Sequence, residues 1–317
     1  MQPFFRTLLA AILFLAPHAV AAQGAAVFLD IPTDARSAAM GGAGTALSAD
    51  AFSAFRNTAQ LPFAEMRVGG GYTYLPWMRN LIPETTLHAS ALYFKPNERQ
   101  AVSLGFRHFT QYGSEHTDDN GNVLGRLRPR DMAFDIGYSR IVAKGLSIAL
   151  TGRYIRSDAG TGHAENTFAF DAGLFYRRAL FRSHVLTFGF QAANFGGDID
   201  YGGGRHSLPW QLKAGSAVDF ALVQAHHLTL TAEAGYRLRP TEARAWSGRF
   251  GAEYRCYGIA TLRGGYCLGD RSAGEQRYGS VGAGVRWKYV AADAACLLAG
   301  KDSPLHKTWM LTVLFNW

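Results

Sequence analysis

The stretch WMLTVLFNW, residues 309–317, alternates strictly between two rows of side chains. Every second residue from Trp309 to Trp317 is aromatic or aliphatic, while the intervening positions include Thr312 and Asn316. Since successive side chains of a β-strand point to opposite faces of the sheet, this period of two predicts a strand with one face against apolar surroundings.

An aromatic residue at the end of such a strand resembles the sorting signal of bacterial outer-membrane β-barrels. The same alternation also occurs in an ordinary amphipathic strand of a soluble β-sandwich. The choice between these two interpretations therefore depends on the rest of the chain.

Strands of the same period fill the chain from Met66 onward. About fourteen segments of roughly ten residues alternate in this way, which is an even number and the length that tilted membrane-spanning strands need. They begin near Met66, Thr85, Gln100, Arg130, Gly145, Asn166, His184, Leu208, His227, Arg244, Ile259, Arg277, Val290 and His306.

The connections between these segments alternate in length. Short connections lie near Pro96, Lys144, Tyr257 and Lys288. Long polar connections lie at residues 111–129, 157–165, 195–207 and 269–276. Short periplasmic turns that alternate with long external loops are typical of membrane barrels. The predicted fold class is therefore all-β, a transmembrane antiparallel β-barrel of about fourteen strands with an N-terminal plug segment.

Charged side chains keep to one row of each predicted strand. Trp246 and Phe250 share one row of their strand, while Arg249 and Glu253 share the other. A charge in the middle of the lipid face costs about 2–4 kcal/mol, so the charged rows must face the lumen. Because these rows carry both signs, we expect a structural charge network in a narrow or plugged pore rather than a selective ion path. The predicted network comprises Arg107, Asp135, Arg153, Asp171, Lys213, Glu233, Arg249, Glu253, Arg255 and Arg286.

Two segments of different character precede the strands. Residues 1–22 have the parts of a secretory signal peptide, with the charge of Arg6, a short apolar run and a segment of small residues, and we expect cleavage after Ala21 or Ala22. Residues 23–65 are rich in Ala and Gly and show no strand period, so we expect a plug or hatch segment. The barrel domain is then expected to span residues 66–317.

Composition and motifs argue against catalysis and nucleic-acid binding. The three cysteines have no metal-binding spacing, and the formal charge of +8 is spread along strands instead of gathered in one tract. The pair His206-Ser207 lacks a rigidly placed carboxylate, and residues 118–121 lack the distal Glu of a calcium loop. His116, His163 and His306 show no ligand spacing. We therefore predict a protein that is not an enzyme, without catalytic residues, metal site, cofactor or nucleic-acid partner.

A sequence motif marks the segment before the first strand. Its residues are Ala35, Arg36, Met40, Gly41, Gly42, Asp50, Asn57 and Ala59. This pattern resembles the start of the PorV/PorQ family, which is related to the FadL group of fourteen-stranded outer-membrane barrels. Residues 118–142 also resemble that family's third outer loop and the strand after it. One departure is Asn57-Thr58-Ala59, where the family usually has Asn-Pro-Ala and the proline would preset the backbone.

The resemblance implies a function and a location. Proteins of the PorV/PorQ type serve type IX secretion and surface attachment as membrane scaffolds, which implies the outer membrane of a Gram-negative bacterium and contact with its lipid. The implied partner is a secretion or surface-attachment protein at the external loops, especially residues 111–129 and 195–207. FadL relatives instead carry hydrophobic molecules through a lumen closed by the N-terminal segment. A channel for a hydrophobic ligand is therefore the alternative, and an apolar pocket between plug and wall would favour it.

Overall fold

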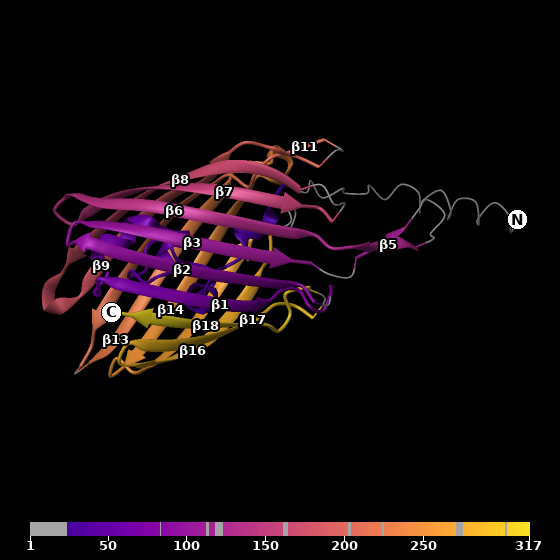
Figure 1. Cartoon of the computed structure of the whole chain (residues 1–317). Coiled ribbons are helices and arrows are strands. Elements are labelled where there is room, and N and C mark those ends of the chain that lie inside the picture. The colour runs from indigo at the N-terminus through magenta and orange to yellow at the C-terminus, as the bar shows by residue number, and fades with distance from the viewer. Residues whose placement is uncertain are drawn as a thin grey trace, which may run out of the picture.

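The chain forms a closed antiparallel barrel (Figure 1). The structure is a computed structural model that describes residues 24–82, 84–111, 114–117, 123–160, 164–201, 204–223, 225–270, 275–301 and 303–317. The expected signal peptide, residues 1–22, lies outside these residues. No helix within the described ranges is long and apolar enough to cross a membrane.

Fourteen strands make up the barrel, which confirms the predicted fold class. They are β1 (Val68–Pro76), β2 (Thr86–Asn97), β3 (Gln100–Thr110), β6 (Arg130–Ala143), β7 (Leu146–Asp158), β8 (Ala164–Ala179), β9 (Val185–Gly196), β12 (Gln211–Ala221), β13 (His226–Arg237), β14 (Ala245–Cys256), β15 (Ala260–Gly269), β16 (Tyr278–Trp287), β17 (Val290–Leu298) and β18 (Thr308–Asn316). Two small hairpins lie in long loops, β4 (Ser114–Thr117) with β5 (Val123–Leu127) and β10 (Ile199–Asp200) with β11 (Arg205–His206).

The first and last strands close the ring. β1 pairs with β18 from Gly69↔Asn316 to Tyr74↔Leu311, and the backbones of Val68 and Trp317 exchange two hydrogen bonds of 2.8 Å. The two faces of β18 agree with the predicted alternation. Leu311 is 48% exposed on the outer face, whereas its neighbours Met310 and Thr312 are buried on the inner face. This closure leaves no free strand edge at the seam of the ring.

The two ends of the barrel differ. Turns of a few residues and the C-terminus lie at one end, and the longer loops with β5 and β11 lie at the other (Figure 1). We call these the short-turn end and the long-loop end. In outer-membrane barrels the end with short turns usually faces the periplasm, and we expect the same orientation here.

The N-terminal segment, residues 24–65, runs through the interior from the long-loop end to the short-turn end. It contains η1 (Val27–Asp30), α2 (Ala35–Ala39), α3 (Ser53–Arg56) and η2 (Thr58–Phe63), while η3 (Phe181–Ser183) and η4 (Thr241–Ala243) lie in connections between strands. At the long-loop end, the Ala25 N–H donates to the Ser207 carbonyl at 3.0 Å. At the other end the segment continues directly into β1.

Apolar side chains of this segment fill the long-loop half of the barrel. Phe28 is fully buried in a cluster with Leu87, Phe109, Ile155 and other inward-facing residues. Burial of a phenylalanine side chain contributes about 1.5–3 kcal/mol, so this cluster anchors the start of the segment.

Glycines on the inner wall let the segment approach the strand backbones. A Cβ atom at Gly265 would lie 2.2 Å from the Gly41 nitrogen, and one at Gly251 would lie 2.6 Å from the Met40 Cβ atom. Gly264, the neighbour of Gly265, faces outward and would meet no heavy atom closer than 4.0 Å. The inner glycines therefore set the distance between segment and wall.

We predict that Gly265→Leu destabilises the protein by displacing the N-terminal segment. Overpacking of this kind costs about 1–3 kcal/mol in the free energy of unfolding. Urea unfolding in detergent micelles measures this loss, and limited proteolysis of the folded protein measures exposure of the segment. Gly264→Leu is the matched control, because its side chain enters the lipid face; equal destabilisation by both variants would contradict the prediction.

Candidate functional site

The interior contact between the N-terminal segment and the barrel wall is the candidate functional site. Short capped turns shape the segment. The Asp34 carboxylate accepts hydrogen bonds from the Ser37 N–H at 2.9 Å and the Ser37 hydroxyl at 2.7 Å, which starts α2. Gly41 and Gly42 follow α2 with φ angles of 69° and 83°, a conformation that favours glycine. The chain therefore turns sharply at Gly41, whose N–H donates to the Ser280 hydroxyl at 2.9 Å.

The Asn57-Thr58-Ala59 turn contacts the wall through side chains. The Asn57 amide donates to the carbonyls of Thr45 at 3.1 Å and Leu174 at 2.9 Å. The Thr58 hydroxyl lies 2.9 Å from that of Thr151 on β7. Thr58 occupies the first position of η2, where a proline is tolerated because the N–H needs no helical partner. Threonine at this position adds a polar contact to the wall that proline lacks.

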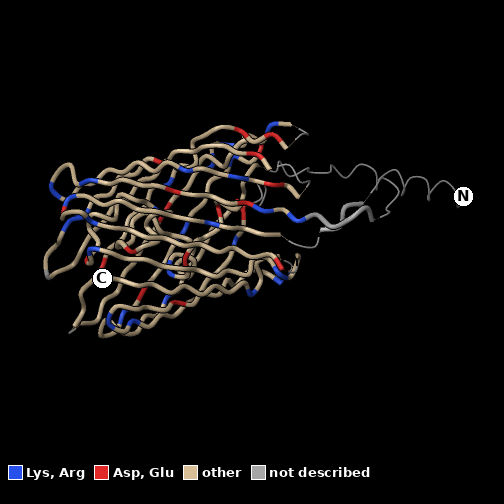
Figure 2. The backbone as a smooth tube through the Cα atoms, viewed as in Figure 1, with Lys and Arg blue, Asp and Glu red and all other residues tan. Residues whose placement is uncertain are grey.

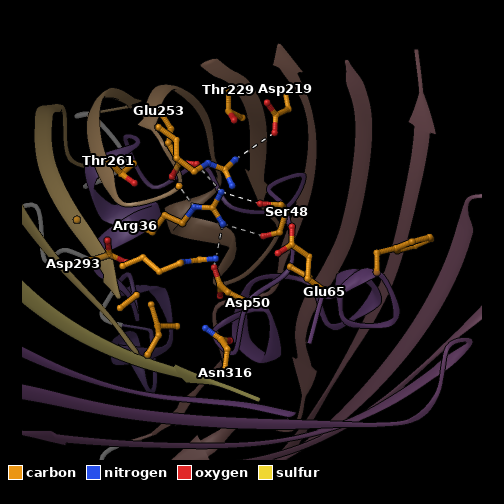
Figure 3. Close-up of a pocket in the computed structure, with 18 of the residues that line it drawn as sticks. Arg36, Ser48, Asp50, Glu65, Asp219, Thr229, Glu253, Thr261, Asp293 and Asn316 are labelled. Carbon is orange, nitrogen blue, oxygen red and sulfur yellow. Dashed lines mark hydrogen bonds and ion pairs between the residues drawn. The ribbon is translucent and has the colours of Figure 1, made fainter. Parts of the chain in front are cut away.

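Arg36 joins the segment to the wall by an ion pair with two hydrogen bonds. Its Nε donates to Glu253 Oε2 at 2.8 Å and its Nη2 to Glu253 Oε1 at 2.9 Å. The same guanidinium contacts Asp50 at 3.3 Å and the Ser48 carbonyl at 3.1 Å (Figure 3). Both side chains of the Arg36–Glu253 pair are largely buried, with exposures of 12% and 3%. Such a bidentate geometry is the strong form of a carboxylate contact.

Asp50 links two arginines of the segment. Arg56 contacts Asp50 at 2.6 Å and Asp34 at 2.8 Å, while Arg36 contacts Asp50 from the other side. Burial alone would raise the pKa of Asp50, but the guanidinium groups of Arg56 and Arg36 outweigh burial and hold this pKa below its ordinary value of 3.8. Asp50 therefore remains ionised and keeps the two turns together.

A second charge cluster lies on β3, β6, β7 and β8. Arg153 binds both Asp135 and Asp171, and Arg107 contacts Asp135 at 3.2 Å. The Arg107 guanidinium also lies over the rings of Phe28 at 5.9 Å and Phe55 at 5.0 Å. These cation–π contacts connect the cluster to the N-terminal segment.

Glu233 forms a third contact between wall and segment. Its carboxylate accepts hydrogen bonds from the backbone N–H groups of Gly44 at 2.9 Å and Thr45 at 2.8 Å. Arg249 on the neighbouring strand pairs with Glu233 at 2.7 Å. The buried Glu233 carboxylate therefore binds a cation of the wall and two backbone N–H groups of the segment.

The structure brings most residues of the predicted charge network into ion pairs, and some of these pairs reach the N-terminal segment. Glu253 pairs with Arg36 of the segment, and Arg255 pairs with Asp219 at 3.3 Å. Arg286 is exposed at the short-turn end and forms no ion pair with a described residue. Lys213 likewise has no ion-pair partner within the described ranges.

Sequence reasoning missed several charged residues of the site. Arg263 pairs with Glu253 at 2.7 Å and with Asp293 at 2.6 Å. Arg263 and Asp293 occupy inward positions of β15 and β17, so the strand period alone could have identified them. Arg56 and Asp34 belong to the aperiodic segment and had no such signal.

A polar cavity of about 200 Å³ lies between the segment and the wall toward the short-turn end (Figure 3). Its lining includes Arg36, Asp50, Glu253, Arg263 and Asp293, which all take part in ion pairs. Sites for hydrophobic small molecules are lined mostly by apolar and aromatic side chains. The charges of this cavity therefore do not match a hydrophobic ligand.

The other candidate residues form no catalytic or metal constellation in the described part of the chain. The His206 ring packs near Tyr201, with ring centres 5.7 Å apart, and the Ser207 carbonyl accepts the bond from Ala25. His306 Nδ1 lies 2.7 Å from the Ala299 carbonyl. No group of His, Cys, Asp or Glu side chains in the described ranges has metal-binding geometry. His163, residues 118–121 and the side chain of His116 lie outside the described residues.

Comparison with known proteins identifies the family. Residues 18–244 match the family model described as type IX secretion system protein PorV. The chain belongs to the PorV family. The PorV match and the closed barrel together place the protein in the outer membrane of a Gram-negative bacterium. No sequence among the curated proteins matches that of this chain.

Solved structures with the same fold are FadL-like barrels. The toluene transporter TbuX of Ralstonia pickettii is 14% identical with a TM-score of 0.61, covering 90% of this chain and 98% of its own. The toluene transporter TodX of Pseudomonas putida is 13% identical with a TM-score of 0.63, covering 89% and 97%. A FadL homologue of Pseudomonas aeruginosa is 13% identical with a TM-score of 0.56, covering 90% and 99%. At these identities the likeness shows that this PorV family member shares their fold.

We predict that Arg36→Met lowers the free energy of unfolding by about 3 kcal/mol, because it removes one partner of a buried ion pair. Urea unfolding in detergent micelles measures the change. Arg177→Met is the matched control, since Arg177 is exposed and forms no ion pair with a described residue. A loss of the same size in both variants would show that the Arg36–Glu253 pair has no special role.

The stabilising effect of Asp50 should depend on pH. Because the folded-state pKa lies below the ordinary value of 3.8, ionised Asp50 stabilises the folded state above that value and loses this effect as the pH falls through the folded-state pKa. We expect the difference in free energy of unfolding between wild type and Asp50→Asn to be constant from about pH 7 to about pH 5 and to shrink below about pH 4. A difference that stays the same down to about pH 3 would contradict this assignment.

Proposed function

We propose that this PorV family protein is a membrane scaffold of type IX secretion and surface attachment, which binds a partner protein at its external loops. In this proposal the N-terminal segment is a plug, and the protein makes or breaks no covalent bond. Membership of the PorV family supports the secretion role.

The observation that carries the proposal is the filled interior of the barrel. Arg36 and Glu233 each contribute contacts between segment and wall, and the Phe28 cluster fills the long-loop half. Removal of the segment would expose unpaired charges and apolar surface together, at a cost of several kcal/mol. A segment held in this way suits a rigid scaffold better than an open conduit.

The long loops provide a surface for a partner. The β4–β5 hairpin projects beyond the end of the barrel (Figure 1), and β10 and β11 form a second hairpin at the same end. An extended hairpin offers backbone groups with which a partner strand can pair. These two loops, residues 111–129 and 195–207, are the proposed contact sites.

The likeness to barrels described as toluene transporters favours a second candidate function, a channel for a hydrophobic molecule. Such a path needs an apolar site between plug and wall. The charged lining of the cavity beside Arg36 and Glu253 favours the scaffold over this alternative.

We predict that replacing residues 114–127 with a flexible linker reduces secretion of type IX cargo to the level of a gene deletion. The barrel should remain folded, as judged by heat-modifiable gel mobility, because its strands are untouched. Secreted and periplasmic cargo are measured by quantitative immunoblot, and a pull-down with the wild-type protein should recover a secretion or surface-attachment protein. Normal secretion with loss of uptake of a labelled aromatic hydrocarbon would instead support the channel.

A further inference from the structure

Four exposed cations form an arc along the rim of the barrel at the short-turn end. They are Arg99, Arg140, Lys144 and Arg178. The Arg99 carbonyl accepts a 2.8 Å hydrogen bond from Ile141, and the Gly145 carbonyl accepts one of 2.7 Å from Arg177, so the arc is continuous from the β2–β3 turn to β8. Figure 2 shows Lys and Arg residues gathered at the turns of this end.

Two of these cations, Arg140 and Arg178, lie on the lipid face of the barrel, and the other two lie in the adjoining turns. Arg140 follows Ile136 and Tyr138 on the outward row of β6, and both of these residues are exposed. Arg178 lies on the outward row of β8, four residues beyond the exposed Leu174. Two to four residues of strand span about 7–13 Å, so Arg140 and Arg178 lie at the edge of the apolar band, near the depth of lipid headgroups.

Negative charge near the arc is scarce. The carboxylates of β6, β7 and β8 lie in the middle or the long-loop half of these strands, at Asp131, Asp135, Asp158, Glu165 and Asp171. Glu98 in the β2–β3 turn is engaged by Lys95 at 3.2 Å. None of the four cations forms an ion pair with a carboxylate in the described part of the chain.

We propose that this arc binds the phosphate groups of anionic phospholipids in the periplasmic leaflet of the outer membrane. Exposed apolar residues flank the cations, including Phe94, Val142 and Phe181, with exposures of 46%, 51% and 81%. Cations interleaved with apolar side chains match a lipid, which offers a phosphate next to acyl chains. An acidic periplasmic protein would instead meet the cations of the barrel mouth, such as Arg177 and Arg286.

The test uses the purified full-length protein in detergent micelles and native mass spectrometry. Phosphatidylglycerol and phosphatidylethanolamine with identical acyl chains are the probes. The wild-type protein should retain more phosphatidylglycerol than phosphatidylethanolamine. A variant with Arg99, Arg140, Lys144 and Arg178 all changed to Gln should lose at least about tenfold of this preference, since each cation near an anionic surface contributes about fivefold.

A matched variant changes Arg156, Arg205, Lys301 and Lys307 to Gln, which removes the same charge from exposed positions at the long-loop end. This control should keep the wild-type preference. The proposal is overturned if the arc variant prefers phosphatidylglycerol as strongly as wild type, or if the control loses the preference equally.

Two further measurements keep the result interpretable. Heat-modifiable gel mobility verifies that each variant is folded. In wild type, raised salt should weaken the preference for phosphatidylglycerol, because screening acts on exposed charges. Binding of polyglutamate at the arc without any lipid preference would assign the surface to an acidic protein and reject the lipid.

Discussion

Backbone groups in a bilayer have no water to bind, and each unpaired N–H or C=O group there costs several kcal/mol. The pairing of β1 with β18 meets this requirement by closing the ring. Closure also fixes which row of every strand faces lipid, because the side-chain period of a strand is two. The arrangement of charges in this molecule therefore follows from the seam between its first and last strands.

Most charges of the inward rows are paired inside the barrel. Arg153 satisfies two carboxylates of the wall, whereas Glu253 and Glu233 use partners from the N-terminal segment. The segment therefore complements the wall as well as filling it. Inner glycines such as Gly265 provide the room that this close contact needs.

The strands and their faces could be predicted from the sequence because the alternation depends only on residues that are close together in the chain. Strand positions and the alternation of short turns with long loops both followed from it. The partner of Arg36 did not, because Glu253 lies 217 residues away and the contact depends on the path of an aperiodic segment. Arg286 shares the inward period of its strand but lies at the mouth, where no described carboxylate reaches it. A period of two predicts which face of the sheet a side chain points to, but it does not predict how far along the barrel axis the residue lies.

The path of residues 24–65 has a consequence for assembly. The segment starts near Ser207 at the long-loop end and joins β1 at the opposite end. If the ring closed first, the N-terminal segment would have to be threaded along the full length of the barrel interior, past inner-wall residues that bind it. An order in which the seam forms last, around a segment already laid against the growing sheet, avoids that threading. In this order the N-terminal segment is a template for the barrel, because the strands assemble around a segment that is already in place.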